Sequence, residues 1–355
     1  MRTLSDTIAR LTAFRRAGET AEMPSGDLAE ITEFGSNPGR LRAFFHVPAI
    51  LPPRAPLVVV LHGCTQNAAG YDACSGWSRL AEAQGFAVLF PEQQRANNAN
   101  LCFNWFQPAD TRRDAGEALS IRQMVERMVL DHGLDRSRVF VTGLSAGGAM
   151  ASVMLAAYPE VFAGGAIIAG LPYGVAESVP EAFDRMRGHG LPDAGRLEAL
   201  VRGASDHAGP WPTVSVWQGS ADKTVSPSNA DAIVAQWLGL HGVGPRATRA
   251  GAEGGIPHAV WCDRQGRAVI ERHDIPGMGH GTPLDSAEAD ETAGPYMLDV
   301  GISSTRHIAQ FWGIAPAAAT VREAPRRAAA AAAPEPVSGV RQTIEAALRQ
   351  AGLMR

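Results

Sequence analysis

Ser145 lies in a Gly-x-Ser-x-Gly pattern at residues 143–147, directly after a run of β-prone residues. Gly143 and Gly147 lack the Cβ atoms that would clash in a tight strand-to-helix turn. A helix of small residues is expected after the turn, and its N-terminal amides would point toward the serine. The pattern alone recurs by chance, but the strand before it and the helix after it make it specific. It predicts a serine nucleophile; the alternative is an ordinary glycine-rich turn.

A serine hydroxyl is a weak nucleophile at neutral pH, so it needs a base, and the base needs an orienting group. On a chain of alternating strands and helices the expected order is Ser, then Asp or Glu, then His. Asp222 follows an apolar strand in a loop that ends at a helix cap. His280 lies in a glycine-flanked loop late in the chain. We therefore predict Asp222 as the acid and His280 as the base.

Rival acids and bases occur along the same part of the chain. Asp206 lies in an irregular segment, Asp231 inside an expected helix, and Asp274 at the end of an expected strand. His258 and His307 are the remaining rival bases, since the other histidines precede Asp222 or lie in or at the ends of regular elements. Position and order favour Asp222 and His280 over all of them.

An oxyanion hole requires two backbone amides that point toward the developing charge. The residue after the nucleophile, Ala146, is expected to supply one of them. The loop after an early buried strand, residues 62–66, is expected to supply the other through the backbone N–H of Cys64. The alternative for His62-Gly63 is a simple turn.

The elements that must position these residues alternate between strands and helices. Each central strand is apolar throughout, which indicates a parallel sheet with helices on both faces, and hence an α/β fold. A turn at residues 263–266 predicts a hairpin between strands 259–262 and 268–273. The expected strands before it are residues 40–47, 57–61, 87–90, 139–142, 165–169 and 213–218, and the expected helices include 77–84, 114–132, 146–158 and 303–312.

The chain divides into four parts by composition. Residues 1–39 form an N-terminal helix and a lead-in, and residues 40–313 form the catalytic domain. Within it, residues 171–212 are an irregular insertion with two short helices, which either shapes the substrate cleft or is a tolerated surface insertion. Residues 314–338 are an Ala/Pro-rich linker, and residues 339–355 form a short helix that docks on the same chain or on a partner.

Composition excludes several classes of function. The formal net charge of -4 in 355 residues gives no reason to expect a nucleic-acid partner. No apolar run approaches the ~20 residues of a membrane helix, and the first residues do not resemble a secretory signal, so a cytoplasmic location is expected. The four cysteines match no zinc pattern, so no metal site is predicted; their even number permits disulfides without requiring them.

Several motifs together resemble the polyhydroxybutyrate (PHB) depolymerase family of esterases, over roughly residues 41–313. The resemblance implies an α/β-hydrolase fold and ester hydrolysis without a cofactor or metal. It also implies a triad of Ser145, Asp222 and His280 and an oxyanion residue at Cys64. The motifs are Leu61-His62-Gly63-Cys64-Thr65-Gln66, Cys102-Phe103-Asn104-Trp105-Phe106, Gly143 to Met150, Gly170-Leu171-Pro172-Tyr173-Gly174 and Gly277-Met278-Gly279-His280.

The resemblance indicates the reaction more sharply than the substrate. We expect a serine esterase for short-chain hydroxyalkanoate oligomers or polyester, with a feruloyl or acetylxylan esterase as the alternative and an inactive binding module as a remote one. Many relatives are secreted and carry a separate substrate-binding domain, and neither a signal nor such a domain is apparent here. Trp105 and Asn104 are expected to contact the substrate, with packing under the loop as the alternative. Since Cys64 and Cys102 both belong to the shared motifs, they could pair across the mouth of the site.

Overall fold

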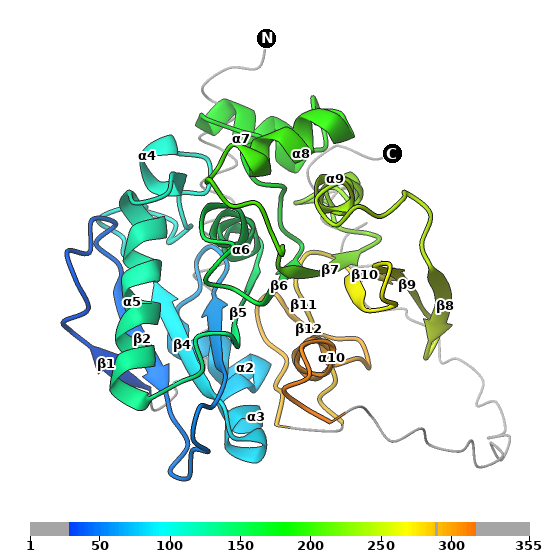
Figure 1. Cartoon of the computed structure of the whole chain (residues 1–355). Helices are drawn as coiled ribbons and strands as arrows, with labels where there is room; N and C mark the ends of the chain where they lie inside the picture. The colour runs from blue at the N-terminus through cyan, green and yellow to red at the C-terminus, as the bar shows by residue number, and fades with distance from the viewer. Residues whose placement is uncertain (1–27, 288–289, 317–355) are drawn as a thin grey trace, which may run out of the picture. The chain divides into compact units, whose positions relative to one another are not determined.

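The computed structural model describes residues 28–287 and 290–316 of the chain. Its main element is a ten-stranded sheet with the strand order β1-β2-β4-β3-β5-β6-β7-β10-β9-β8 (Figure 1). The strands from β4 to β10 are parallel, and antiparallel strands extend both edges. The strands are β1 Ala29–Ile31, β2 Arg42–His46, β3 Leu57–Leu61, β4 Ala87–Glu92, β5 Val139–Leu144, β6 Gly164–Ile168, β7 Thr213–Gly219, β8 Arg249–Glu253, β9 Ile256–Cys262 and β10 Ala268–Ile275; β11 Thr282–Leu284 and β12 Met297–Asp299 form a separate pair.

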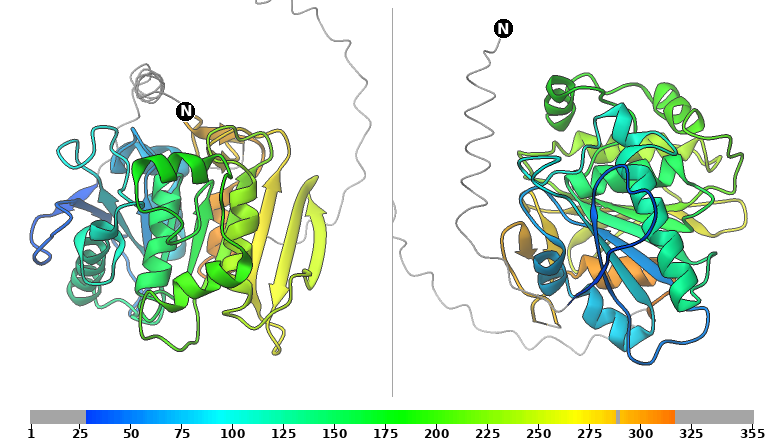
Figure 2. Two further views of the ribbon diagram at one scale, coloured as in Figure 1. Left: turned by 90° about the horizontal axis from the view of Figure 1, so that it is seen from above. Right: turned by 90° about the vertical axis from the view of Figure 1, so that its left-hand side faces the viewer.

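Helices cover both faces of the sheet, because the residues of its central strands β3, β5 and β6 are all apolar or small. In β3, Leu57 and Val59 pack on one face with α5, α6 and α9, whereas Val58 and Val60 pack on the other with α2, α3 and α10. Figures 1 and 2 show these two helical layers. The helices are α2 Ala68–Ser75, α3 Trp77–Gln84, α4 Pro108–Thr111, α5 Gly116–His132, α6 Ala146–Ala157, α7 Val179–Met186, α8 Ala194–Arg202, α9 Ser228–Leu238 and α10 Ser304–Phe311.

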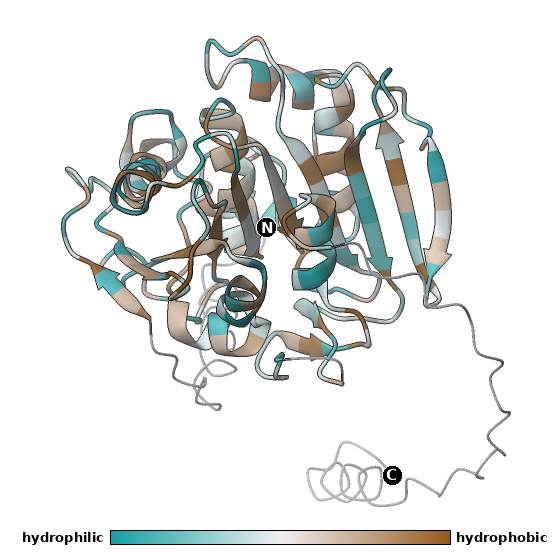
Figure 3. Cartoon of the chain, turned by 60° about the horizontal axis from the view of Figure 1, so that its bottom comes forward, coloured by the Kyte–Doolittle hydropathy of each residue, from teal (hydrophilic) through white to brown (hydrophobic). Residues whose placement is uncertain are grey.

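The α/β-hydrolase fold expected from the sequence is confirmed, and the predicted bounds of β3 and α3 agree with the structure. The strand β8 was not predicted, because all its residues are exposed and it carries no alternation of apolar and polar side chains. In Figure 3, the central strands are accordingly coloured mostly as hydrophobic, whereas the edge strand β8 is coloured mostly as hydrophilic. The short strand β1 lies in the segment that we expected to be only a lead-in.

The predicted N-terminal helix and C-terminal helix lie outside the described residues, as does almost all of the predicted linker. The insertion at residues 171–212 contains α7 and α8, the two short helices expected within it. Within the described part of the chain, no helix combines the length and the apolar character that crossing a bilayer requires.

Candidate active site

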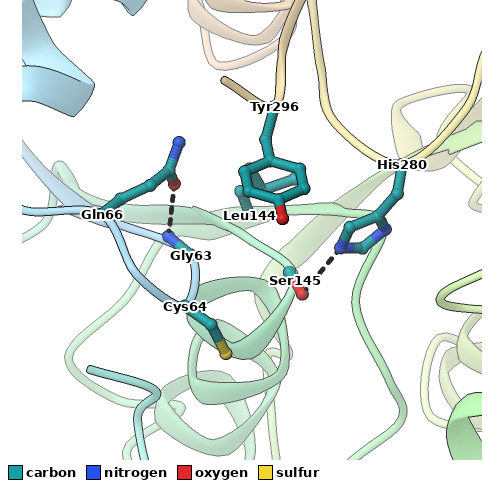
Figure 4. Close-up of a pocket in the computed structure, with 7 residues that line it drawn as sticks. All are labelled: Gly63, Cys64, Gln66, Leu144, Ser145, His280 and Tyr296. Atoms are coloured by element: carbon teal, nitrogen blue, oxygen red, sulfur yellow. Dashed lines mark hydrogen bonds between the residues drawn. The ribbon is translucent and has the colours of Figure 1, made fainter. Parts of the chain in front are cut away.

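Ser145 lies at the junction between β5 and α6 with φ 58° and ψ -115°. A positive φ is rare for a residue with a Cβ, and here it turns the serine hydroxyl out of the sheet. Its Oγ lies 2.9 Å from Nε2 of His280, and a dashed line in Figure 4 marks this hydrogen bond. On the other side of the imidazole, Nδ1 of His280 lies 2.7 Å from Oδ2 of Asp222. The structure thus brings the three residues predicted from order and position into one hydrogen-bonded relay.

The turn at Ser145 tolerates only glycine at the flanking positions of the motif. A Cβ on Gly147 would lie 2.3 Å from the carbonyl oxygen of Leu61, and one on Gly143 would lie 2.5 Å from the backbone of Gly147. Both distances are far below van der Waals contact with backbone atoms that have no room to move. The two glycines therefore let β5, α6 and the end of β3 approach closely enough to hold the serine.

Asp222 is fully buried as a side chain, and its carboxylate accepts several hydrogen bonds. The backbone amides of Thr224 and Val225 donate to Oδ1 at 2.8 and 2.9 Å. Gln218 donates from its side-chain amide to Oδ2 at 3.1 Å, beside the contact from His280. These donors fix the carboxylate in the orientation that receives Nδ1–H of the imidazole.

The loops that carry the acid and the base are tied to each other. The amide of Ala221 donates to the carbonyl oxygen of Met278, and the amide of Ser220 to that of Ile275, both at 3.0 Å. The Ser220 hydroxyl accepts from the amide of Gly277 at 2.9 Å. Since β7 and β10 are parallel neighbours, their ends deliver both loops to the same edge of the sheet.

The loop after β3 holds Cys64 beside the serine, and a disulfide joins Cys64 to Cys102. The pairing that the sequence left open is therefore present. Gly63 donates its amide to Oε1 of Gln66 at 2.8 Å, the second contact drawn in Figure 4. The amide of Thr65 donates to the carbonyl oxygen of Asn100 at 2.7 Å. These contacts hold the loop that is expected to contribute the Cys64 amide, while Ala146 begins α6 on the other side of Ser145.

His62 supports this loop from below as a neutral imidazole. Burial lowers the pKa of His62 to about 4, against the opposing effect of its contact with Gly63. Its Nε2 accepts from the amide of Gln93 at 3.1 Å, so Nδ1 carries the proton and donates to the carbonyl oxygen of Gly63 at 2.7 Å. His62-Gly63 is therefore more than a simple turn, because the imidazole of His62 also links this loop to the residue that follows β4.

A cleft of about 750 Å³ opens in front of Ser145. Trp105 lines it and packs edge-to-face on Phe106 at a centroid distance of 5.5 Å. Asn104 is not among the lining residues; its Oδ1 accepts from Nδ2 of Asn98 at 3.0 Å, and its amide donates to Glu117. The other apolar lining residues are Ala146, Leu171, Val179, Ala182, Phe183, Met186 and Val225, most of them from α7, and the two cationic ones are Arg187 and Lys223.

The rival acids and bases lie elsewhere. Asp231 and Asp274 both pair with Arg272, and His258 lies beside Glu271. The sequence did not reveal Gln218, which bonds Asp222, or Tyr296 and Lys223, which line the cleft. Their types carry no motif, although Lys223 is the only lysine of the chain and follows the predicted acid directly.

Known proteins resemble this chain over its catalytic part. The model of a family described as "Esterase PHB depolymerase" matches residues 42–256. The chain belongs to this family. Among curated members, it is 48% identical over 295 residues to poly(3-hydroxyalkanoate) depolymerase C of Paucimonas lemoignei, covering 81% of this chain and 70% of that one. It is 30% identical over 298 residues to acetylxylan esterase A of Aspergillus oryzae, covering 80% of this chain and 95% of that one.

A solved structure supports the same assignment. The acetyl xylan esterase from Aspergillus awamori superposes with a TM-score of 0.70 and 26% identity, covering 82% of this chain and 100% of that one. This PHB depolymerase family member is therefore a serine esterase, a hydrolase of carboxylic esters.

Proposed function

We propose that this esterase hydrolyses short-chain hydroxyalkanoate esters, as oligomers or polyester, through an acyl-enzyme on Ser145. The observation that carries the proposal is the hydrogen-bonded series Ser145, His280 and Asp222 at an apolar cleft. An ester carbonyl that enters this cleft meets the serine Oγ directly.

In the first half of the reaction, Ser145 Oγ attacks the ester carbonyl carbon while Nε2 of His280 takes its proton. Asp222 holds the imidazole with Nδ1–H toward itself and stabilises the imidazolium that forms. The imidazolium then protonates the leaving alcohol as the carbon–oxygen bond of the ester breaks. In the second half, His280 takes a proton from water as the water attacks the carbonyl carbon of the acyl-enzyme. The imidazolium then returns this proton to Ser145 Oγ as the bond between Oγ and the acyl carbon breaks, and the acid leaves.

The backbone amides of Cys64 and Ala146 are the donors that we assign to the tetrahedral oxyanion. Both residues lie at the cleft beside Ser145. Two preorganised donors at such a site each contribute ~10²–10³ to the rate. The disulfide to Cys102 and the contacts of Gly63 and Thr65 keep the Cys64 loop in place, so the donor does not have to be ordered at the moment of reaction.

The walls of the cleft favour a hydroxyalkanoate over a sugar ester. Trp105, Leu171 and Phe183 offer apolar surface to a chain of short alkyl groups. Arg187 and Lys223 line the same cleft and suit the single carboxylate at the end of a hydroxyalkanoate oligomer. We assign Trp105 to substrate contact and Asn104 to support of its loop, since Asn104 bonds Asn98 and Glu117 instead.

A feruloyl or acetylxylan esterase is the second candidate, and the similarity to acetyl xylan esterases over most of the chain favours it. A panel of 3-hydroxybutyrate trimer, methyl ferulate and acetylated xylan separates the candidates. Our proposal expects the highest kcat/KM on the trimer. A higher value on either of the other two esters contradicts it.

The nucleophile is tested separately from the substrate. We expect Ser145→Ala to abolish hydrolysis of p-nitrophenyl butyrate and labelling by a fluorophosphonate, with an unchanged circular dichroism spectrum. Ser137→Ala, in an exposed turn, is the matched control. Labelling of Ser145→Ala at the wild-type level would show that another residue is the nucleophile, and an unlabelled wild type would indicate an inactive binding module.

Two further expectations stay predictions. The sequence favours a cytoplasmic location, whereas the Cys64–Cys102 disulfide favours an oxidising compartment, because reducing cytosol rarely keeps such bonds. Fractionation of the source cells distinguishes the two.

The C-terminal helix expected at residues 339–355 is proposed to dock on this chain or on a partner, and its deletion followed by a pull-down tests that.

A further inference from the structure

Three metal-ligating side chains meet on the face of the sheet that α10 covers, away from the esterase site. His258 belongs to β9, and Glu271 and His273 belong to β10. His258 and His273 are opposite each other in the antiparallel ladder, so their side chains share a face. Glu271 lies two residues before His273 and shares that face as well. The ring of His307, from α10, lies 6.1 Å from that of His273.

The distances within this cluster are too long for strong hydrogen bonds. Nε2 of His258 lies 3.4 Å from Oε2 of Glu271, and Nε2 of His273 lies 3.6 Å from Oε1. The corresponding contact between His280 and Asp222 is 2.7 Å. Nitrogen and oxygen ligands at ~2.0–2.1 Å from a tetrahedral ion are themselves about 3.3–3.5 Å apart. The two distances end on different oxygens of Glu271. The three ligand atoms lie within 4.8 Å of one another, and small rotations of the side chains would bring them onto one ion.

The two ring nitrogens of His273 are buried without a hydrogen-bond partner among the described residues. The residue is only 2% exposed. Burying a polar nitrogen without a partner is costly, and coordination through Nε2 would supply one. The ring is held parallel to Trp217 at a centroid distance of 3.8 Å. Ser215 donates to Oε1 of Glu271 at 2.6 Å, which orients the carboxylate as the partners of metal ligands do.

We propose that His258, Glu271 and His273 bind a divalent cation of the zinc class. Two imidazoles and one carboxylate suit Zn²⁺ and its neighbours Co²⁺ and Ni²⁺, whereas Mg²⁺ and Ca²⁺ prefer ligands that are all oxygen. The side chain of His258 is 27% exposed, which provides an entry path and leaves a fourth position to water. The sequence showed no such site, because His258 is 13 residues away from Glu271 and only the strand register brings it beside Glu271 and His273.

The ion would have a structural role and would not contact the substrate, since its ligands do not line the cleft. It would tie β9 to β10, and Ser215 of β7 bonds one of its ligands. The strand β7 leads into the loop of Asp222, and β10 leads into the loop of His280. A bound ion would therefore stiffen the two strands from which the acid and base loops project.

Tag-free full-length protein, stripped with a chelator and exchanged into metal-free buffer, is titrated with Co²⁺ and then with Zn²⁺. We expect about one equivalent of Co²⁺ with the visible absorption of a tetrahedral site, displacement by Zn²⁺, and a higher Tm with Zn²⁺. His258→Ala and Glu271→Gln should bind at least about tenfold more weakly. Both variants are conservative for folding, because His258 is partly exposed and a glutamine at position 271 still accepts from Ser215.

His46→Ala is the matched control, because His46 and Glu82 form a similar pair at the surface, 2.9 Å apart. It should bind Co²⁺ as the wild type does. Hydrolysis of p-nitrophenyl butyrate by each variant reports that it is folded. A stripped wild type that takes up no Co²⁺, or variants that bind it as tightly as the wild type, overturns the proposal. Because the readout is spectroscopic, this result does not depend on the substrate of the esterase.

Discussion

Gln218 donates a hydrogen bond from Nε2 to Oδ2 of Asp222 at 3.1 Å, the oxygen that also faces His280. The same amide lies within 3.3 Å of the carbonyl oxygen of Gly219 and 3.2 Å of that of Val225. Gln218, next to the last residue of β7, therefore bonds both the start and the end of the loop that carries Asp222. It does not touch the substrate cleft, so its role is to position Asp222.

We expect Gln218→Met to lower kcat on p-nitrophenyl butyrate by about 10- to 100-fold with little change in KM. Methionine keeps the volume and removes a hydrogen bond to a charged group, which is typically worth ~1.5–3 kcal/mol. Gln265→Met, in the exposed hairpin turn, is the control. An unchanged kcat in a folded Gln218→Met protein would show that the backbone amides of Thr224 and Val225 hold Asp222 by themselves.

Lys223 is predicted to recognise the carboxylate end of an oligomeric substrate. We expect Lys223→Gln to raise KM for the 3-hydroxybutyrate trimer by up to about fivefold, the range of a partly exposed ion pair of ~0.2–1 kcal/mol. KM for the methyl ester of the same trimer should not change, and added salt should shrink the difference between enzymes. Arg264→Gln is the control at an exposed position. Equal effects on the acid and its methyl ester would exclude charge recognition.

The disulfide between Cys64 and Cys102 closes a loop with a sequence separation of 38 residues. Loop-closure entropy assigns such a bridge roughly 4 kcal/mol of stability. We expect Cys102→Ser to unfold at a lower denaturant concentration and a reductant to bring the wild type to the same midpoint. Cys262→Ser, which removes a free thiol, should leave the midpoint unchanged. Two free thiols at Cys64 and Cys102 under non-reducing mass spectrometry would contradict the bridge.

The buried carboxyl of Glu117 is expected to make the free energy of unfolding depend on pH. Burial, with a smaller contribution from Asp110, raises the pKa of Glu117 to about 8. Its carboxyl accepts from the amide of Asn104 at 2.8 Å and from Gln93, so it supports the loop of Trp105. Between about pH 5 and 8 the folded chain keeps a proton that the unfolded chain has released. Its contribution is therefore present at low pH and is lost as the pH rises through that window.

Glu117→Gln removes this proton exchange, so its stability should fall less steeply between pH 5 and 8, by up to about 1.4 kcal/mol per pH unit. The variant starts less stable, since an NH₂ group replaces one accepting oxygen, and the comparison therefore uses slopes. Urea unfolding at a series of pH values measures them. Parallel slopes for the wild type and the variant would show that Glu117 titrates as in the unfolded chain.

Much of the fold follows from local patterns. The apolar run of β3 and the elbow motif at Ser145 identify a buried strand and a strand-to-helix turn, because these depend on neighbouring residues only. Chain order then singled out Asp222 and His280 for the serine. Where the local pattern is absent, prediction failed: β8 has no buried face to mark it, although it extends the sheet beside β9.

By itself, the sequence determined the nucleophile, its candidate partners and the α/β class, since motif, hydrophobic pattern and order act over short stretches. Only the tertiary structure decided that Cys102 reaches Cys64, that Gln218 braces Asp222, and that Lys223 lines the cleft. The same holds for His258 and Glu271, whose side chains meet through the register of two strands. Contacts of this kind depend on which strands lie side by side and in what register, and packing of the whole chain sets both.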